Sequence, residues 1–209
     1  MFSNIQRYYL KEMGIETFEQ RKLSEQKNLE RLAAVVSQCT RCPLHKTRLK
    51  TVFARGNSMA ALMIIGEAPG FYEDQQGLPF VGKAGSLLNK MLGSIELSKE
   101  DVYVANVLKC RPPHNRDPLP EEISQCAHYL TEQIALVSPK LILAVGRFAG
   151  SFLLNTTVPL NKMRRKMHHY QGTPVIVSYH PAYLLRNPSD KVKAYEDLLF
   201  AKQLLKKME

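Results

Sequence analysis

Four cysteines are the residues whose spacing points most directly to chemistry. Cys39 and Cys42 form the segment CTRC, whereas Cys110 lies in KCRPPHNRDP and Cys126 in SQCAHYL. The start of the chain lacks an apolar export signal, so we expect a cytoplasmic protein, in which disulfides are rare. Four thiolates suit a zinc ion or an iron–sulfur cluster equally well on count alone. The wide spacing of Cys110 and Cys126, one in a loop and one in a helix, leans toward a cluster.

A second segment, GLPFVGKA at residues 77–84, differs by one residue from a phosphate-binding P-loop. A working P-loop needs Ser or Thr after its lysine to bind magnesium, and it joins a strand directly to a helix. Ala84 stands at the hydroxyl position, and the preceding apolar run ends near Glu67, well before the loop. The sequence therefore predicts a different kind of pocket.

The elements that position these residues alternate along the chain. Helical patterns separate continuously apolar runs, which are typical of strands buried on both faces. This alternation predicts an α/β fold, a three-layer α/β/α sandwich with a central four-stranded parallel sheet. The expected strands are 61–67, 101–108, 140–146 and 174–180, and the expected helices are 83–95, 120–137, 147–155 and 188–206.

Polar residues follow the ends of these strands, where parallel sheets bind ligands. Gly66 and Glu67 end the first strand, Asn106 the second and His180 the fourth. A carboxamide offers an acceptor beside a donor, which matches the N3–H and O4 of uracil, and His180 can donate to a carbonyl. Phe80 is a side chain that could stack on a base. Each residue type is more often a cap or a core residue, so their convergence on one crevice carries this prediction.

The net charge of +10 predicts a polyanionic partner, nucleic acid before membrane. The basic segment NKMRRKMHHY fits a solvated loop or a phosphate-contacting loop equally well. No apolar run approaches the roughly 20 residues that span a bilayer.

Three segments carry a family resemblance. They resemble the signature segments of the family 4 uracil-DNA glycosylases, the iron–sulfur branch of the uracil-DNA glycosylase superfamily. The segments are GEAPGFYEDQQGLPFVGKAG, NVLKCRPPHNRDP and HPAYLLRNPS, and the match runs from about Val36 to the C-terminus. The resemblance implies a base excision repair enzyme that hydrolyses the N-glycosidic bond of uracil in DNA and leaves an abasic site. It also implies that the four cysteines hold a structural [4Fe-4S] cluster.

The resemblance also implies residue roles. Phe80 would stack on the flipped uracil, Asn106 would read its edge, and His180 would bind O2. Glu73 would guard the space around uracil C5. The remaining implied pocket and hydrolytic residues are Gly66, Ala68, Glu67 and, ranked behind Glu67 for positioning water, Asp74.

We expect DNA contacts from Lys83, Arg164, Arg165, Leu185 and Arg186. Leu184, Leu185 and Arg186 are all candidates to fill the gap that a flipped base leaves in the duplex.

Residues 1–28 read as an N-terminal extension to a catalytic domain at 29–209. RYYLKEMGIETFEQRK is weakly similar to the start of the bacterial clamp-loader psi subunit, at Leu10, Gly14, Ile15 and Phe18, which suggests a replication or repair partner. A plain disordered or helical extension is an alternative of at least the same weight. We expect a monomer. The alternative to an enzyme is a non-catalytic, metal-stabilised DNA-binding module.

Overall fold

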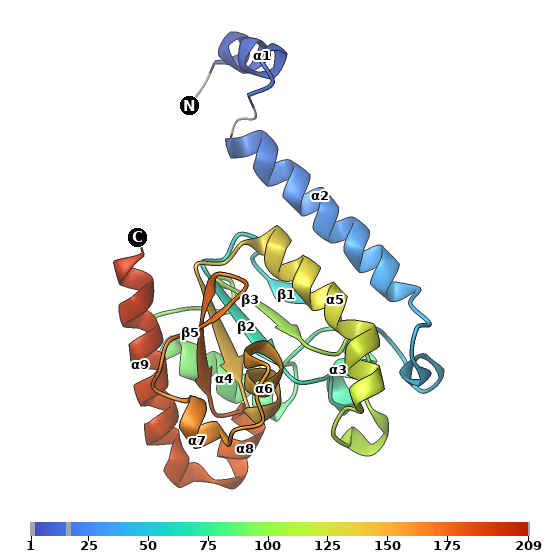
Figure 1. Ribbon diagram of the computed structural model, residues 1–209, viewed down its shortest axis with the longest axis vertical. Helices are drawn as coiled ribbons and strands as arrows, with labels where there is room; N and C mark the ends of the chain where they lie inside the picture. Colours follow the sequence, from blue (N-terminus) through green and yellow to red (C-terminus); the bar gives the residue numbers. More distant parts are fainter. Residues whose placement is uncertain (1–2, 16–17, 209) are drawn as a thin grey trace.

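The computed structural model describes residues 3–15 and 18–208 and shows one sheet between layers of helices (Figure 1). The sheet has six strands in the order β1-β3-β2-β4-β6-β5. The four predicted parallel strands form its centre, and two short antiparallel strands, which the sequence did not reveal, close its edges. The strands are β1 (Arg55–Gly56), β2 (Leu62–Gly66), β3 (Val102–Asn106), β4 (Leu141–Val145), β5 (His168–Tyr170) and β6 (Thr173–Ser178).

Helices cover both faces of this sheet, which confirms the predicted α/β/α sandwich. One face packs against α5 (Pro120–Val137) and α6 (Arg147–Leu154) through residues such as Leu130 and Leu153. The opposite face packs against α4 (Lys83–Gly93) and α9 (Lys191–Lys207) through residues such as Leu88 and Leu198. Every residue of β2, β3 and β4 is buried, as a strand covered on both faces requires. The short helices are α3 (Phe71–Gln76), α7 (Leu160–Met163) and α8 (Pro181–Arg186), with single 3₁₀ turns at Pro43–Lys46, Pro113–Asn115 and Pro188–Asp190.

The register of the parallel strands brings the predicted polar residues together. Gly66 at the end of β2 pairs with Asn106 at the end of β3. Ser178 ends β6 beside Val145 of β4, and His180 follows two residues later. The carboxyl ends of three parallel strands thus meet at one edge of the sheet.

A close contact sets the entry into α4. A Cβ atom added at Gly85 would lie 1.7 Å from the carbonyl oxygen of Phe80. Phe80 has a φ of 55°, a left-handed conformation that costs a side-chain-bearing residue about 1–3 kcal/mol. Glycine at position 85 therefore allows the loop to fold back onto the first turn of α4 and to hold Phe80 in this conformation.

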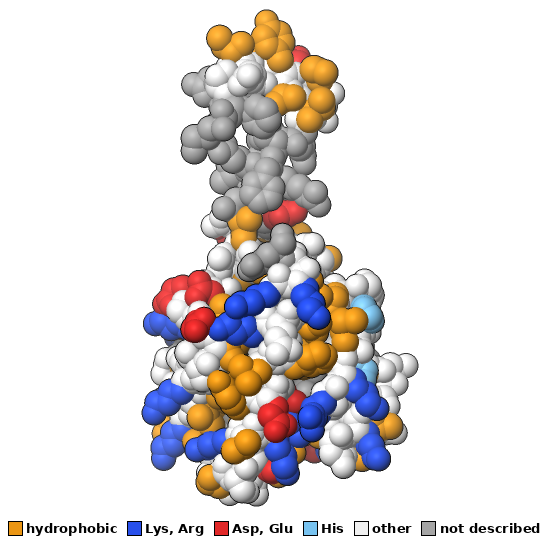
Figure 2. Space-filling view, turned by 90° about the vertical axis from the view of Figure 1, so that its left-hand side faces the viewer, with side chains coloured by type: hydrophobic (Ala, Val, Ile, Leu, Met, Phe, Trp, Pro, Cys, Tyr) orange, Lys and Arg blue, Asp and Glu red, His pale blue; other side chains and the backbone are white. Residues whose placement is uncertain are grey.

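The N-terminal part consists of two helices that lead away from the sheet. α2 (Phe18–Ser37) packs on α5 through its C-terminal half, and α1 (Asn4–Glu12) lies beyond its far end (Figure 1). The predicted boundary at residue 28 falls inside α2, just before the buried Leu29. Figure 2 shows apolar side chains at the tip of this extension, and the exposed ones are Ile5, Tyr8, Tyr9, Met13 and Ile15. The side chain of Phe18 lies outside the described residues.

None of the helices in the described ranges combines the length and the apolar character that crossing a membrane requires.

Candidate active site

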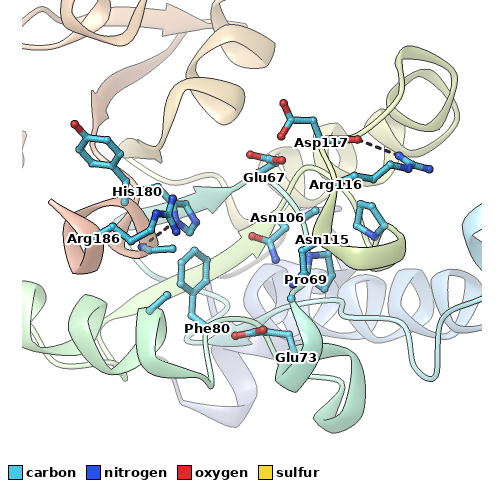
Figure 3. Close-up of a pocket in the computed structure, with 16 residues that line it drawn as sticks. Glu67, Pro69, Glu73, Phe80, Asn106, Asn115, Arg116, Asp117, His180 and Arg186 are labelled. Atoms are coloured by element: carbon cyan, nitrogen blue, oxygen red, sulfur yellow. Dashed lines mark hydrogen bonds between the residues drawn. The ribbon is translucent and has the colours of Figure 1, made fainter.

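A cavity of about 410 Å³ opens at the carboxyl edge of the parallel strands (Figure 3). Its walls come from the loops after β2, β3 and β6, from the start of α8 and from the loop between α3 and α4. The sequence-predicted residues that line it are Glu67, Ala68, Glu73, Phe80, Asn106, His180 and Arg186.

Gly66, a predicted pocket residue, does not line the cavity but lies directly against two side chains that do, Asn106 and Phe80. A Cβ at this position would lie 2.4 Å from Oδ1 of Asn106 and 2.8 Å from Cζ of Phe80. The missing side chain therefore lets the carboxamide and the aromatic ring approach each other at the strand end. Asn106 is only 2% exposed, and its Oδ1 is the one buried side-chain polar atom of the described residues that has no hydrogen-bond partner. An unpaired buried acceptor is costly, so a ligand N–H at this point would be strongly favoured.

Glu73 fixes the loop that carries Phe80. Its Oε1 accepts hydrogen bonds from the backbone N–H groups of Val81 at 3.1 Å and Gly82 at 3.2 Å. The carboxylate thus has one oxygen on the loop while the side chain still faces the cavity (Figure 3). Its position at the wall is compatible with the predicted guard over one edge of a bound base.

His180 is held in one tautomer by the helix that it caps. The backbone N–H of Ala182 donates to Nδ1 of His180 at 3.1 Å, so Nδ1 is the acceptor and a neutral ring carries its proton on Nε2. Burial, assisted by the nearby charge of Arg186, lowers the pKa of His180 to about 4. The ring lies 5.6 Å from that of Phe80, measured between centroids. His180 is therefore a neutral donor at physiological pH.

Glu67 is a cavity carboxyl whose pKa lies close to neutral pH. Burial raises the pKa of Glu67 to about 7; the charge of Asp117 raises it further and that of Arg147 opposes the shift. Asp117 lines the same cavity, where Figure 3 shows its carboxylate beside that of Glu67. A carboxyl with a pKa near the working pH can exist in either protonation state, which is a common property of catalytic groups.

The sequence did not predict one wall of the cavity, which is formed by the loop before α5. The loop after Cys110 brings Asn115, Arg116 and Asp117 to the cavity. Glu122 anchors Arg116 through two hydrogen bonds, of 2.9 and 2.6 Å, and Asn115 has a φ of 54°. The polar run HNRD after the prolines was the available signal, but only the fold shows that it turns toward β2.

The structure corrects the prediction for Asp74. This residue is 2% exposed and does not line the cavity. Its Oδ1 accepts hydrogen bonds from the backbone N–H groups of Leu49 at 3.0 Å and Lys50 at 3.4 Å. The carboxylate holds that loop in place, so we assign Asp74 no part in positioning water.

The structure also corrects the prediction that Arg164 contacts DNA. Its guanidinium is buried, pairs with both oxygens of Asp197 at 2.7 and 3.0 Å, and lies 4.3 Å over the ring of Tyr179. Asp197 also accepts from Ser178, the last residue of β6. Arg164 therefore stabilises the end of β6, the strand that precedes His180, and is not available to DNA phosphates.

The other predicted DNA contacts are accessible. Lys83, Arg165 and Arg186 are exposed, and Leu185 is 43% exposed. Leu184 is fully buried, which removes it as a candidate to fill a gap in the duplex. Lys and Arg side chains are spread over the face of the globular part shown in Figure 2.

The four cysteines line one small cavity beside α5, together with Arg41, His45, Arg48 and Lys109. Nη1 of Arg48 donates to Sγ of Cys110 at 3.1 Å, and the backbone N–H of Lys109 donates to Sγ of Cys126 at 3.3 Å. Burial raises the pKa of Cys126 to about 11. Within the described ranges, no group of three or more His, Cys, Asp or Glu side chains is arranged as a metal-ion site. The thiols nevertheless fit a cluster in type, location and cationic surroundings.

Comparison with known proteins identifies the class. Residues 53–202 match the family model of the uracil DNA glycosylase superfamily, and the chain belongs to this superfamily. Within it, the chain is 42% identical over 183 residues to the type-4 uracil-DNA glycosylase of Thermotoga maritima, covering 86% of this chain and 95% of the relative. It is 43% identical over 171 residues to the type-4 uracil-DNA glycosylase of Archaeoglobus fulgidus, covering 77% and 85%. These relatives confirm the family resemblance.

The two neighbouring arginines 164 and 165 give a matched test of the structural assignment. We expect Arg164→Met to lower the free energy of unfolding by about 3–5 kcal/mol, because it leaves Asp197 buried without its partner. Arg165 has a side chain that is 73% exposed and lies 3.9 Å from Glu196. Arg165→Met should therefore change stability by no more than about 0.5 kcal/mol. Urea unfolding of both variants measures the difference, and equal losses would contradict the assignment.

Proposed function

We propose that this protein removes uracil from DNA by hydrolysing the N-glycosidic bond, which leaves an abasic site for base excision repair. The observation that carries the proposal is the cavity at the strand ends, where an unpaired amide oxygen, a neutral histidine donor and an aromatic ring converge. The type-4 uracil-DNA glycosylases to which the chain is similar support the same substrate.

Recognition of the base follows from the polar atoms of the cavity. Oδ1 of Asn106 would accept from uracil N3–H and its Nδ2 would donate to O4, whereas cytosine presents the reverse pattern at these atoms. Phe80 would stack on the flipped base. Glu73, held by the backbone of residues 81 and 82, would occupy the space beside C5 and exclude the methyl group of thymine.

The chemistry requires opposite charges to be stabilised at the two ends of one bond. When the N1–C1′ bond breaks, the electron pair stays on uracil and positive charge develops on the sugar. Nε2–H of His180 would donate to O2 of the departing anion, because the other ring nitrogen accepts from Ala182. Ionised Glu67 would stabilise the sugar cation and orient the water. As the hydroxyl adds to C1′, the carboxylate would take up the proton of the water, which finally neutralises the uracil anion.

Exposed basic and apolar side chains would supply the contacts to DNA, and one of them, Arg186, lines the cavity. Lys83, Arg165 and Arg186 would neutralise phosphates, which makes affinity salt-dependent. Leu185 or Arg186, both exposed in the last turn of α8, would fill the gap left by the flipped base.

We further propose that Cys39, Cys42, Cys110 and Cys126 hold a [4Fe-4S] cluster with a structural role. A cysteine-bound cluster fits a cytoplasmic location, where thiols stay reduced. Iron and sulfide analysis of anaerobically purified protein tests this proposal, and stoichiometric zinc in their place would contradict it.

For the extension we propose a partner-binding role, with a single chain forming the catalytic unit. The exposed apolar residues of α1 support it. Capture of a replication or repair protein by the full chain, compared with a chain lacking residues 1–28, is the test, and equal capture by both would refute it.

The activity test uses an oligonucleotide with one uracil. After incubation and alkali, strand cleavage at the uracil shows excision. His180→Ala should reduce the single-turnover rate by about a hundredfold or more, because it removes a preorganised donor to developing charge. His169→Ala, the same substitution at an exposed site on the edge strand β5, should leave the rate unchanged. DNA binding by the wild type without cleavage would favour a non-catalytic module, and a near-wild-type rate for His180→Ala would refute its role.

The pH dependence of the rate follows from Glu67. The carboxylate form exists above its pKa of about 7, so the rate should rise with pH and level off near pH 8. His180, with a pKa of about 4, remains neutral across this range and adds no step. Glu67→Gln should remove the step, and Asp117→Asn should move its midpoint to lower pH. A single-turnover rate that falls as pH rises through 7 would show that the protonated form is required.

A further inference from the structure

Lys109 is a fully buried lysine between the two functional regions. It follows Asn106 by three residues and precedes Cys110 directly, and it is 1% exposed. An isolated ammonium is expensive to bury, so its position requires hydrogen bonds and a compensating charge.

Its main chain belongs to the cysteine region. The N–H of Lys109 donates to Sγ of Cys126 at 3.3 Å, and its carbonyl accepts from the N–H of Val52 at 2.8 Å. The side chain reaches back to the end of β3 and to α5. Nζ donates to the main-chain oxygen of Asn106 at 2.7 Å and to Oε1 of Gln133 at 2.5 Å.

Gln133 is itself fixed, because its Nε2 donates to the hydroxyl of Tyr103 at 3.0 Å and to the carbonyl of Phe53 at 3.2 Å. The ammonium is therefore held between a rigid acceptor on α5 and the end of β3. Its location is determined by the core and does not depend on solvent.

The peptide unit after Asn106 is bonded at both of its polar atoms. Its oxygen accepts from Lys109, and its N–H, which belongs to Val107, donates to the carbonyl of Gly66 at 2.9 Å. These two bonds fix the plane of the peptide, and together with the pairing of Asn106 with Gly66 in the sheet they hold the backbone from which the Asn106 side chain leaves. The unpaired carboxamide oxygen of Asn106 has no bond of its own to hold it in place.

The two hydrogen bonds of the ammonium bring no negative charge to it. Both acceptors of the ammonium are neutral, whereas Lys109 lines the same small cavity as Cys110 and Cys126. Thiolate ligands at these positions would supply the negative charge that the buried cation lacks.

We propose that Lys109 is a positioning residue that joins the cysteine-lined cavity to the uracil pocket: thiolates stabilise its charge, and its ammonium orients the carboxamide of Asn106. This inference rests on the proposed function for the identity of the base. It gives the cysteine region a specific effect on base recognition in addition to its effect on stability.

Lys109→Met removes the charge and the donor at similar side-chain length. In the cluster-loaded protein we expect the dissociation constant of free uracil, measured by equilibrium dialysis, to rise about tenfold or more. The affinity for a uracil-free oligonucleotide should stay within about twofold, because the phosphate contacts are unchanged. Iron and sulfide per protein should fall. Lys99→Met, at a side chain that is 60% exposed, is the matched control and should change none of these values.

Lys109→Arg separates charge from position. It keeps the cation, so iron and sulfide should remain near wild type, but it displaces the donor, so uracil should bind more weakly. Wild-type uracil affinity in either variant would overturn the positioning of Asn106, and wild-type iron content in Lys109→Met would overturn the charge compensation. Equal losses of uracil and uracil-free DNA binding would show a general structural effect and would also overturn the proposal. If Lys109→Met does not fold, the uracil affinity of Lys109→Arg alone tests whether Lys109 positions Asn106.

Failure of the proposed function and failure of the Lys109 inference give different results. A wild-type protein that binds free uracil but releases none from DNA would refute the glycosylase activity, whereas the uracil affinities and iron contents of the Lys109 variants would still test the inference.

Discussion

The pairing of β2 with β3, which ends with Gly66 opposite Asn106, is the constraint on which the site depends. A slip of one residue would turn Asn106 to the other face of the sheet and replace the glycine that admits both the carboxamide and the Phe80 ring. The register is secured by the burial of both strands on both faces. Packing far from the cavity therefore determines the geometry of recognition inside it.

The pocket combines groups whose protonation is set by burial. His180 is neutral because the interior disfavours its cation, and the same effect raises the pKa of Glu67 to about 7. The backbone N–H of Ala182 then decides which nitrogen of the imidazole carries the proton. A single helix N-terminus thus converts an amphoteric ring into a donor of fixed direction, which is the property that a leaving anion requires.

Much of the fold and the location of the site could be predicted from the sequence. Apolar runs marked the four central strands, and their ends marked Asn106 and His180, because local composition determines burial in a parallel sheet. The edge strands β1 and β5 were missed because two or three residues carry too little pattern. Asp74 and Arg164 were assigned by residue type and neighbourhood, but their surroundings are tertiary: Leu49 and Asp197 are distant in sequence. Asn115 and Asp117 reach the cavity only through the path of a loop.

The continuous helix α2 has a mechanical consequence. Its 20 residues correspond to a length of about 30 Å, and its C-terminal turn leads directly to the loop that bears Cys39 and Cys42. A helix of this kind is a semi-rigid spacer, whereas the end-to-end distance of a coil fluctuates. Any molecule engaged at the far end of α2 would consequently be kept at a set separation from the cysteine-lined cavity. The extension would then act as a spacer that leaves the mouth of the pocket open to DNA.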